Sequence, residues 1–354
     1  MGFARRRAAL MGEPNAYGRT RRAGYALAKE RNLTYIVGNG GRPETGEEAM
    51  QFSDRFKSEA SCRDFLIKLR WPKGFVCPKC GHDQAWWVER DLYRCSKCDY
   101  QASLTAGTIF HGSRTPLMVW FKAMWHVTHA RFGISALGLQ KELNLGSYHT
   151  AWAWMHKLRA AMVRPGRDRL GGVIEVSVMY MGGHRPGKRG RGAEGKNLVV
   201  AVVQSEGNRI GRIRLRRIPN ASASELEKVV QQEVEAGSTV LTDGWSGFGG
   251  LGALGYKHVA IRKGAGKGEP RLVQTSKVSQ LMDQWLRKTH QNGVQCAYLD
   301  YCLDEFTFRF NRRTWRSRDK LFDALVQQAA MVPPPARAKN SQPGDSQLLE
   351  AAPI

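Results

Sequence analysis

The sequence predicts an α/β protein of several domains, with an N-terminal zinc ribbon, a helix-turn-helix bundle and a C-terminal α/β domain. Two C-x-x-C pairs stand close together in the front third of the chain. Apolar residues then recur at helical spacing through residues 113–163. Finally, the run GGVIEVSVMYMGG at residues 171–183 has the β-branched and apolar content of a buried strand. This strand opens the predicted α/β domain.

The composition indicates a protein that binds nucleic acid. The chain has 354 residues, 42% of them hydrophobic, which is enough for two or three domains with apolar cores. Its 55 Lys and Arg against 31 Asp and Glu leave a net charge of +24. A polyanion is the natural partner, because each neutralised phosphate releases a counterion.

Cellular location is also constrained by the sequence. No apolar run approaches the roughly 20 residues that cross a bilayer. The seven cysteines, an odd number, suit a reducing compartment better than a disulfide framework. We therefore expect a cytoplasmic, nucleoid-associated protein that does not contact a membrane.

The two ends of the chain show little structural patterning. Residues 1–50 are rich in Arg, Gly and Ala and have little apolar periodicity. We expect a flexible basic arm, which either clamps a DNA backbone or is an over-long translation start without a role. Residues 332–354, with three consecutive prolines, are expected to form a disordered tail.

Residues 51–112 predict a helix followed by a zinc ribbon. In the helix from Ser58 onward, Cys62 shares an apolar face with Leu66 and is expected in the core. Fourteen residues separate the two cysteine pairs. Thiolate pairs on two hairpin knuckles can close a tetrahedral site around Zn²⁺ with no open position, so this zinc would be structural; redox-active cysteines are the alternative. The candidate zinc ligands are Cys77, Cys80, Cys95 and Cys98.

Residues 113–163 predict three helices. Pro116 begins the first, residues 134–143 form the second, and a turn at Asn144-Leu145-Gly146 leads to a third that begins at Ser147. A helix, a tight turn and a second helix form the helix-turn-helix pattern, although many small helical bundles share it. On the third helix the expected core face comprises Tyr148, Trp152, Met155, Leu158 and Met162. The expected DNA-contacting face comprises His149, Thr150 and Lys157, with Ala153 and His156 beside them.

A basic linker at residues 163–170 separates the bundle from the α/β domain at residues 171–331. Residues 184–196 form a basic loop that either lies along phosphates or is a solvated hairpin tip. The strand at residues 210–218 alternates Arg with Ile and Leu, which predicts one cationic and one apolar face. The candidate DNA contacts in these two segments are Arg185, Lys188, Arg189, Arg191, Arg212 and Arg214.

Asp243 is the candidate metal-binding carboxylate of this domain. It follows the predicted strand at residues 238–241 and precedes Gly244. A carboxylate at the C-terminal tip of a buried strand is well placed to hold Mg²⁺ and act in catalysis. The alternative is an Asp that only caps a turn.

Five motifs in a fixed order carry a resemblance to a known family. They are the ribbon, SLTAGTIFHGSRTPLMVWFKAM at 103–124, GGVIEV at 171–176, TDGWSGF at 242–248 and LDEFTFRFNRR at 303–313. Over about residues 51–330 the chain resembles the insertion-sequence transposases with an N-terminal zinc ribbon, the ISXO-like class of DDE-type transposases. The resemblance implies an RNase H-like fold in which three carboxylates hold two Mg²⁺ for DNA strand cleavage and transfer. It also implies a homo-oligomer bound to the terminal repeats of the element.

The chain departs from the family pattern at two of the three carboxylate positions. Asp243 fits the second position, but the pattern E-V-D-E-T-Y reads E-V-S-V-M-Y here, which places Ser177 where the metal-bridging Asp is expected. Leu281 falls at the third position, on a predicted helix. Asp283 points about 200° around that helix from Leu281. Glu175 lies on the same side of the strand as Ser177 but roughly 7 Å away, so neither acid is a good replacement.

We therefore expect a DNA-binding transposase whose catalysis is lost or weakened and whose use of Mg²⁺ is in doubt. Asp304 and Glu305 are expected to pair with Arg309, Arg312 or Arg313 on their own helix and not to restore the site. One alternative is an active transposase with an altered metal site. Another is a non-catalytic zinc-ribbon and helix-turn-helix regulator that needs only residues 51–163.

Overall fold

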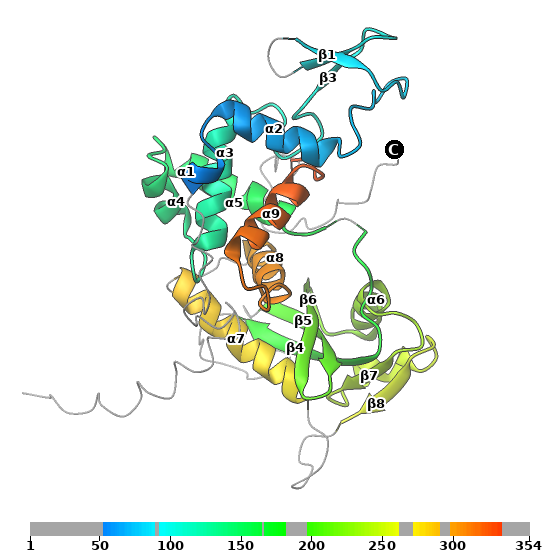
Figure 1. Ribbon diagram of the computed structural model, residues 1–354. Helices are drawn as coiled ribbons and strands as arrows, with labels where there is room; N and C mark the ends of the chain where they lie inside the picture. Colours follow the sequence, from blue (N-terminus) through cyan, green and yellow to red (C-terminus); the bar gives the residue numbers. More distant parts are fainter. Residues whose placement is uncertain are drawn as a thin grey trace, which may run out of the picture.

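The computed structural model describes residues 52–88, 92–164, 166–181, 197–261, 272–290 and 298–334. Figure 1 shows a small ribbon of strands, a group of helices, and a larger sheet flanked by helices. The expected arm at residues 1–50 and all but the first three residues of the expected tail lie outside the described residues. The same is true of Arg185, Lys188, Arg189 and Arg191. Within the described part of the chain, no helix is both long and apolar enough to cross a membrane.

The ribbon is a three-stranded antiparallel sheet of order β1-β2-β3. Its strands are β1 (Ala85–Val88), β2 (Leu92–Cys95) and β3 (Gln101–Ser103). The ring of Tyr93 on β2 lies edge-on to Trp71, with ring centroids 5.2 Å apart, and Trp71 packs in the same way on Phe75 at 5.1 Å. These rings join the ribbon to the helix that precedes it, because Trp71 directly follows that helix.

The helical group begins where local capping signals predict it. Its members are α1 (Phe52–Arg55), α2 (Glu59–Arg70), α3 (Leu117–His129), α4 (Ala136–Glu142), α5 (Tyr148–Ala161) and α9 (Arg318–Ala329). The Ser58 hydroxyl accepts a hydrogen bond from the backbone of Ser61 at the start of α2. Pro116 precedes the first turn of α3, as the sequence predicts. The carboxylate of Glu59 accepts hydrogen bonds from the Leu117 and Met118 backbone N–H groups, at 2.6 and 2.9 Å. It thereby caps α3 and ties it to α2.

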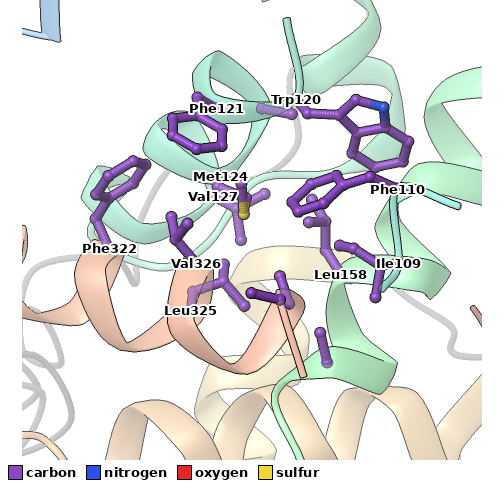
Figure 2. Packing of buried hydrophobic residues seen from close by; sticks show 14 of the residues in the cluster. Ile109, Phe110, Trp120, Phe121, Met124, Val127, Leu158, Phe322, Leu325 and Val326 are labelled. Atoms are coloured by element: carbon purple, nitrogen blue, oxygen red, sulfur yellow. The ribbon is translucent and has the colours of Figure 1, made fainter. Parts of the chain in front are cut away.

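The core of this helical group combines the front of the chain with its last described helix. Figure 2 shows Phe322, Leu325 and Val326 of α9 facing Phe121 and Val127 of α3. Cys62 is completely buried in the same cluster, which confirms it as a core residue. The predicted domain at residues 171–331 includes α9, yet α9 packs within the helical group (Figure 1). Residues near 320 therefore complete a core that begins near residue 52.

The larger sheet has five strands in the order β6-β5-β4-β7-β8. They are β4 (Val173–Met181), β5 (Asn197–Glu206), β6 (Arg209–Ile218), β7 (Thr239–Thr242) and β8 (Lys257–Ala260). Strands β4, β5 and β6 pair antiparallel, whereas β7 runs parallel to both β4 and β8. The predicted opening strand is thus β4, the central strand of the sheet.

Helices cover both faces of this sheet (Figure 1). On one face, Ile174 and Val176 form an apolar cluster with α6 (Ala223–Glu233) and the 3-10 helix η2 (Ser246–Leu251). On the other face, Met179 and Val199 cluster with α7 (Val273–His290) and α8 (Leu299–Phe310). Because side chains alternate along a strand, Glu175 and Ser177 belong to the face covered by α7, together with Met179.

Candidate zinc centre and acidic site

The four predicted zinc ligands converge on one point. The Sγ atoms of Cys77, Cys80, Cys95 and Cys98 all lie within 4.8 Å of one another. The Sγ atoms of Cys77 and Cys98 are 3.7 Å apart, and those of Cys80 and Cys95 are 3.6 Å apart. A tetrahedral Zn²⁺ with Zn–S bonds of about 2.3 Å requires sulfurs separated by about 3.8 Å. The cysteines therefore fit structural zinc, and they leave no position open for catalysis.

Two equivalent backbone turns hold these sulfurs. In the first, the Gly81 N–H donates to the Cys77 carbonyl at 2.9 Å; in the second, the Asp99 N–H donates to the Cys95 carbonyl at 3.1 Å. Gly81 and Asp99 both have left-handed backbone, with φ of 72° and 57°, which Gly and Asp tolerate better than most residues. Burial raises the pKa of the Cys77 thiol, but hydrogen bonds from the Cys80 and Lys79 backbone bring it down to about 7. The turn thus favours the thiolate that zinc binds.

The first two positions of the expected carboxylate site lie on β4 and directly after its neighbour β7. In the parallel pair of β4 and β7, Val176 stands opposite Thr242. Ser177 is the next residue of β4, on the face covered by α7, and Asp243 directly follows the end of β7. Asp243 is half-buried, and its Oδ1 accepts a hydrogen bond from the Trp245 N–H at 3.3 Å. Asp243 therefore makes the turn-capping contact of the alternative interpretation, and Ser177 adds no charge beside it.

Glu175 has a structural partner. Its side chain is 4% exposed, and its Oε2 accepts hydrogen bonds from the Gln274 and Thr275 N–H groups, both at 2.9 Å. These N–H groups belong to the first turn of α7, where unpaired backbone donors need an acceptor. Burial raises the pKa of Glu175 despite these hydrogen bonds. Glu175 is therefore the cap of α7.

The third position is apolar and packed. Leu281 on α7 is 7% exposed and belongs to the same buried cluster as Met179 and Trp285. Asp283 is exposed and forms an ion pair with Arg287, one helical turn away. Among the residues that the structure describes, the four cysteines are the only group of three or more Cys, His, Asp or Glu side chains placed to hold a metal ion.

Glu305 pairs more widely than the sequence predicts. It is fully buried, and its two oxygens bind the Nε atoms of Arg309 at 3.0 Å and Arg159 at 2.9 Å. The pair with Arg309 is the expected one, whereas Arg159 comes from α5. Burial raises the pKa of Asp304 to about 7, and the strongest neighbouring charges are those of Arg216 and Arg167. The expectation that Asp304 pairs within its own helix is therefore wrong.

On α5, the structure keeps two of the predicted DNA contacts at the surface. His149 and Thr150 are exposed in the first turn, behind a Ser147 cap that accepts a hydrogen bond from the His149 N–H at 3.2 Å. Lys157 is half-buried, with its ammonium 5.7 Å from the centroid of the Trp120 ring. The first turn of α5 therefore presents polar side chains to solvent, as a DNA-reading helix would.

The predicted core face of α5 is confirmed for Met155, Leu158 and Met162, which are buried, and needs correction at its other positions. Tyr148 is 46% exposed, whereas Trp154 is 6% exposed and stacks on Trp120 with ring centroids 4.0 Å apart. His156, expected on the outer face, is buried, and burial together with Arg159 lowers its pKa to about 4. It is a neutral core histidine that contacts the Tyr301 ring at a centroid distance of 4.4 Å.

The cationic face predicted for β6 is buried at its middle residue, Arg214. Arg214 is 5% exposed and donates hydrogen bonds to the carbonyls of Asp168 and Ile213, at 3.1 and 3.0 Å. Glu233 at the end of α6 pairs with two arginines of β6: its carboxylate lies 3.4 Å from Arg214 and 2.6 Å from Arg216. This burial contradicts the expectation that Arg214 contacts DNA. Arg212 is half-buried beside Gln204 and still reaches solvent.

Two family models match the chain. The ISXO2-like transposase domain matches residues 169–311, and the transposase zinc-ribbon domain matches residues 57–101. The fold and the cysteine site thus define a zinc-ribbon transposase. The chain belongs to the ISXO2-like insertion-sequence transposases with an N-terminal zinc ribbon, as the sequence motifs indicate. A comparison with curated proteins gives no match.

Proposed function

We propose that the protein binds the terminal repeats of a DNA element as a transposase whose strand cleavage and transfer are lost or greatly weakened. One observation carries the proposal: of the three expected carboxylates only Asp243 is present, because Ser177 on β4 and the buried Leu281 on α7 occupy the other two positions. Two divalent ions a few ångströms apart need bridging negative charge to offset their repulsion. A hydroxyl and an isobutyl group supply none.

The architecture supports the remaining parts of this proposal. Three antiparallel strands followed by two parallel ones, with helices on both faces, are in keeping with an RNase H-like domain at residues 171–331. Helices α4 and α5 meet at a turn where Asn144 has a left-handed φ of 49°. This arrangement supports a helix-turn-helix unit within residues 113–163, with α5 as the helix that reads DNA.

The proposed DNA contacts are those whose side chains remain available. His149, Thr150 and Lys157 would approach the bases or phosphates from α5, and Arg212 would approach the backbone from β6. Four further candidates, outside the described residues, are Arg185, Lys188, Arg189 and Arg191. A homo-oligomer would bring two such surfaces to the paired ends of the element.

The test uses the full chain, with its zinc, on duplexes carrying the terminal repeats of its own element. We expect sequence-dependent binding, together with no Mg²⁺- or Mn²⁺-dependent cleavage or strand transfer above that of the Asp243→Ala variant. Robust wild-type cleavage that is abolished by Asp243→Ala would overturn the proposal in favour of an active, altered metal site. Failure of the wild-type chain to bind any duplex would overturn the DNA-binding part.

The packing argues against a regulator that needs only the front of the chain. Phe322 and Val326 of α9 fill the core between α3 and α5, so residues 51–163 alone would expose apolar surface. A double variant, His149→Ala with Thr150→Ala, separates the two functions in the full chain. It should weaken DNA binding while leaving zinc content and thermal stability unchanged, because both side chains are exposed.

A further inference from the structure

A pocket lined by arginines lies where α8 ends, α9 begins and α3 passes behind them. Its volume is about 40 Å³, and its walls include Arg309, Arg312, Arg313, Trp315, Ser317 and Arg318. Room of this size holds about three water molecules, comparable to the oxygens of one tetrahedral anion. Most of its lining lies beyond residue 311, where the match to the transposase domain ends. None of its lining residues belongs to the carboxylate site or the zinc centre.

The arginines of this pocket are held largely by neutral groups. Arg312 donates to the Phe308 carbonyl at 3.2 Å, and its guanidinium lies over the Phe308 ring, 4.1 Å from the centroid. Arg318 donates to the His129 carbonyl. Arg313 donates to the Gly211 carbonyl at 3.2 Å. Carbonyl acceptors and ring faces fix the orientation of a guanidinium but leave its full positive charge in place.

Two carboxylates of the described residues bond residues of the pocket wall. Glu305 binds Arg309, but it also binds Arg159. Asp319, in the first turn of α9, accepts hydrogen bonds from His129 at 3.2 Å and from the Ser317 hydroxyl at 2.9 Å. The wall itself carries four guanidiniums, those of Arg309, Arg312, Arg313 and Arg318, and no carboxylate. Burial lowers the pKa of Arg312 to about 10, so this charge sits in a partly desolvated place.

The geometry points to a binding site for a phosphate oxyanion, and we propose that its ligand is a phosphodiester group of the DNA backbone. Guanidiniums present planar pairs of donors that match phosphate oxygens. The N-terminus of α9, a 12-residue helix capped by Ser317, adds the positive end of its dipole. Trp315, 40% exposed, stands at the rim, where an aromatic ring can stack on a sugar or base. The source of the phosphate rests on the proposed DNA binding.

The sharpest test changes Ser317, because two substitutions there keep the helix cap and differ only in charge. Asp and Asn cap helices about as well as Ser. In the Ser317→Asp variant a carboxylate enters the pocket, so we expect at least a tenfold loss of duplex affinity. The Ser317→Asn variant should stay within about twofold of wild type. A third variant, Arg318→Gln, should reduce the slope of log affinity against log salt by about 0.9, the value for one phosphate contact.

A second arm uses inorganic phosphate and calorimetry on the same zinc-loaded proteins. Wild type, Ser317→Asn and Arg316→Gln should bind phosphate, whereas Ser317→Asp should not; Arg316 is exposed and outside the pocket wall. Equal behaviour of the Asp and Asn variants in both arms would overturn the site. Loss in the phosphate arm alone would overturn DNA as the source. If wild type fails to bind duplex, the proposed function fails, and the phosphate arm still decides the pocket.

Discussion

The zinc ribbon and the α7-covered face of the large sheet are two places where negatively charged ligands must be brought together to hold metal ions. In the ribbon, the four thiols converge on one another at tetrahedral spacing. On the sheet, the nearby carboxylates have other partners: Asp243 bonds a turn and Glu175 caps α7. The family fold is present in both regions, but a complete ligand set is present only in the ribbon.

The difference follows from what holds each region together. The ribbon has three short strands, and binding of its metal supplies most of its folding free energy, so losing one cysteine would unfold it. The sheet is held by two apolar clusters, one on each face, and none of these residues binds a metal. Replacing a strand carboxylate by Ser177 removes like-charge repulsion with Asp243 and leaves the core intact. The sheet therefore does not depend on this charge for its folding, whereas the proposed loss of catalysis follows from its absence.

The largest expected effect is that of removing zinc. Stripping the metal with a chelator, or the Cys80→Ser substitution, should unfold the ribbon, because structural zinc contributes about 10–16 kcal/mol in such sites. Zinc content and limited proteolysis between residues 72 and 103 measure the result. Cys62→Ala is the control, since Cys62 is buried away from the metal and should keep the zinc. Full ribbon protection without zinc would contradict the assignment.

The next largest effect concerns Glu305, a buried carboxylate that pairs with two arginines. Glu305→Gln leaves Arg159 and Arg309 buried without their counter-ion, so we expect a loss of about 3–5 kcal/mol in the free energy of unfolding. Urea denaturation measures it. Asp283→Asn is the matched control: it removes an exposed i,i+4 pair and should cost less than about 0.5 kcal/mol.

The same residue predicts a pH dependence. Burial raises the pKa of Glu305, but Arg159 and Arg309 outweigh it and hold the pKa below its ordinary 4.5. The ionised group therefore contributes stability above pH 4.5, and that contribution is lost as the pH falls through the lower folded value. Glu305→Gln should flatten this part of the acid denaturation curve. An unchanged curve would show that the pair is not a source of stability.

A smaller effect, measured on metal affinity, tests the acidic site directly. Ser177→Asp places a second carboxylate beside Asp243, and we expect Mn²⁺ or Mg²⁺ to bind about tenfold to a hundredfold more tightly, or about 1.4–2.7 kcal/mol. Ser177→Asn, equal in size but neutral, should bind no better than wild type. Calorimetry makes the comparison, and the gain should vanish when Asp243→Ala is added. Tight binding of Mn²⁺ or Mg²⁺ by the wild-type chain would contradict the contrast between the zinc ribbon and the sheet.

The elements that the sequence predicts well depend on local chemistry. The cysteine spacing defines the zinc ligands, and Ser58 and Pro116 mark helix starts through backbone groups within one turn. The residues at the first and third carboxylate positions are also read from the sequence, because Ser177 stands within the E-V-S-V-M-Y run and Leu281 on a predicted helix at the third position. Whether Asp243 binds a metal stays a prediction.

The features that the sequence does not predict depend on contacts between distant segments. Arg159 meets Glu305 across 146 residues, and α9 returns to pack on α3. The core face of α5 is predicted only in part: Met155 and Leu158 are buried as expected, but Trp152 and Trp154 give the helix aromatic residues on two sides, and packing on Trp120 selects Trp154. The sequence predicts Arg214 to be an exposed cation, because its partner Glu233 on α6 lies beside it only in the folded chain.

The smallest expected effect decides whether Glu175 belongs to the structure or to a metal site. Glu175→Ala removes the acceptor for two N–H groups of α7 and should cost about 1 kcal/mol, as loss of a helix cap does. Glu175→Gln keeps an acceptor oxygen and should cost less. Since burial raises the pKa of Glu175, its ionisation lowers stability as the pH rises from 4.5, and the Gln variant should lose that slope. In assays run in parallel with the Ser177→Asp variant, neither Glu175 variant should change the affinity for divalent metal, because the Glu175 carboxylate caps α7. A loss of metal affinity in Glu175→Gln would instead show that Glu175 is a metal ligand. The sheet would then contribute Glu175 as well as Asp243 to a metal site, which would contradict the contrast with the ribbon.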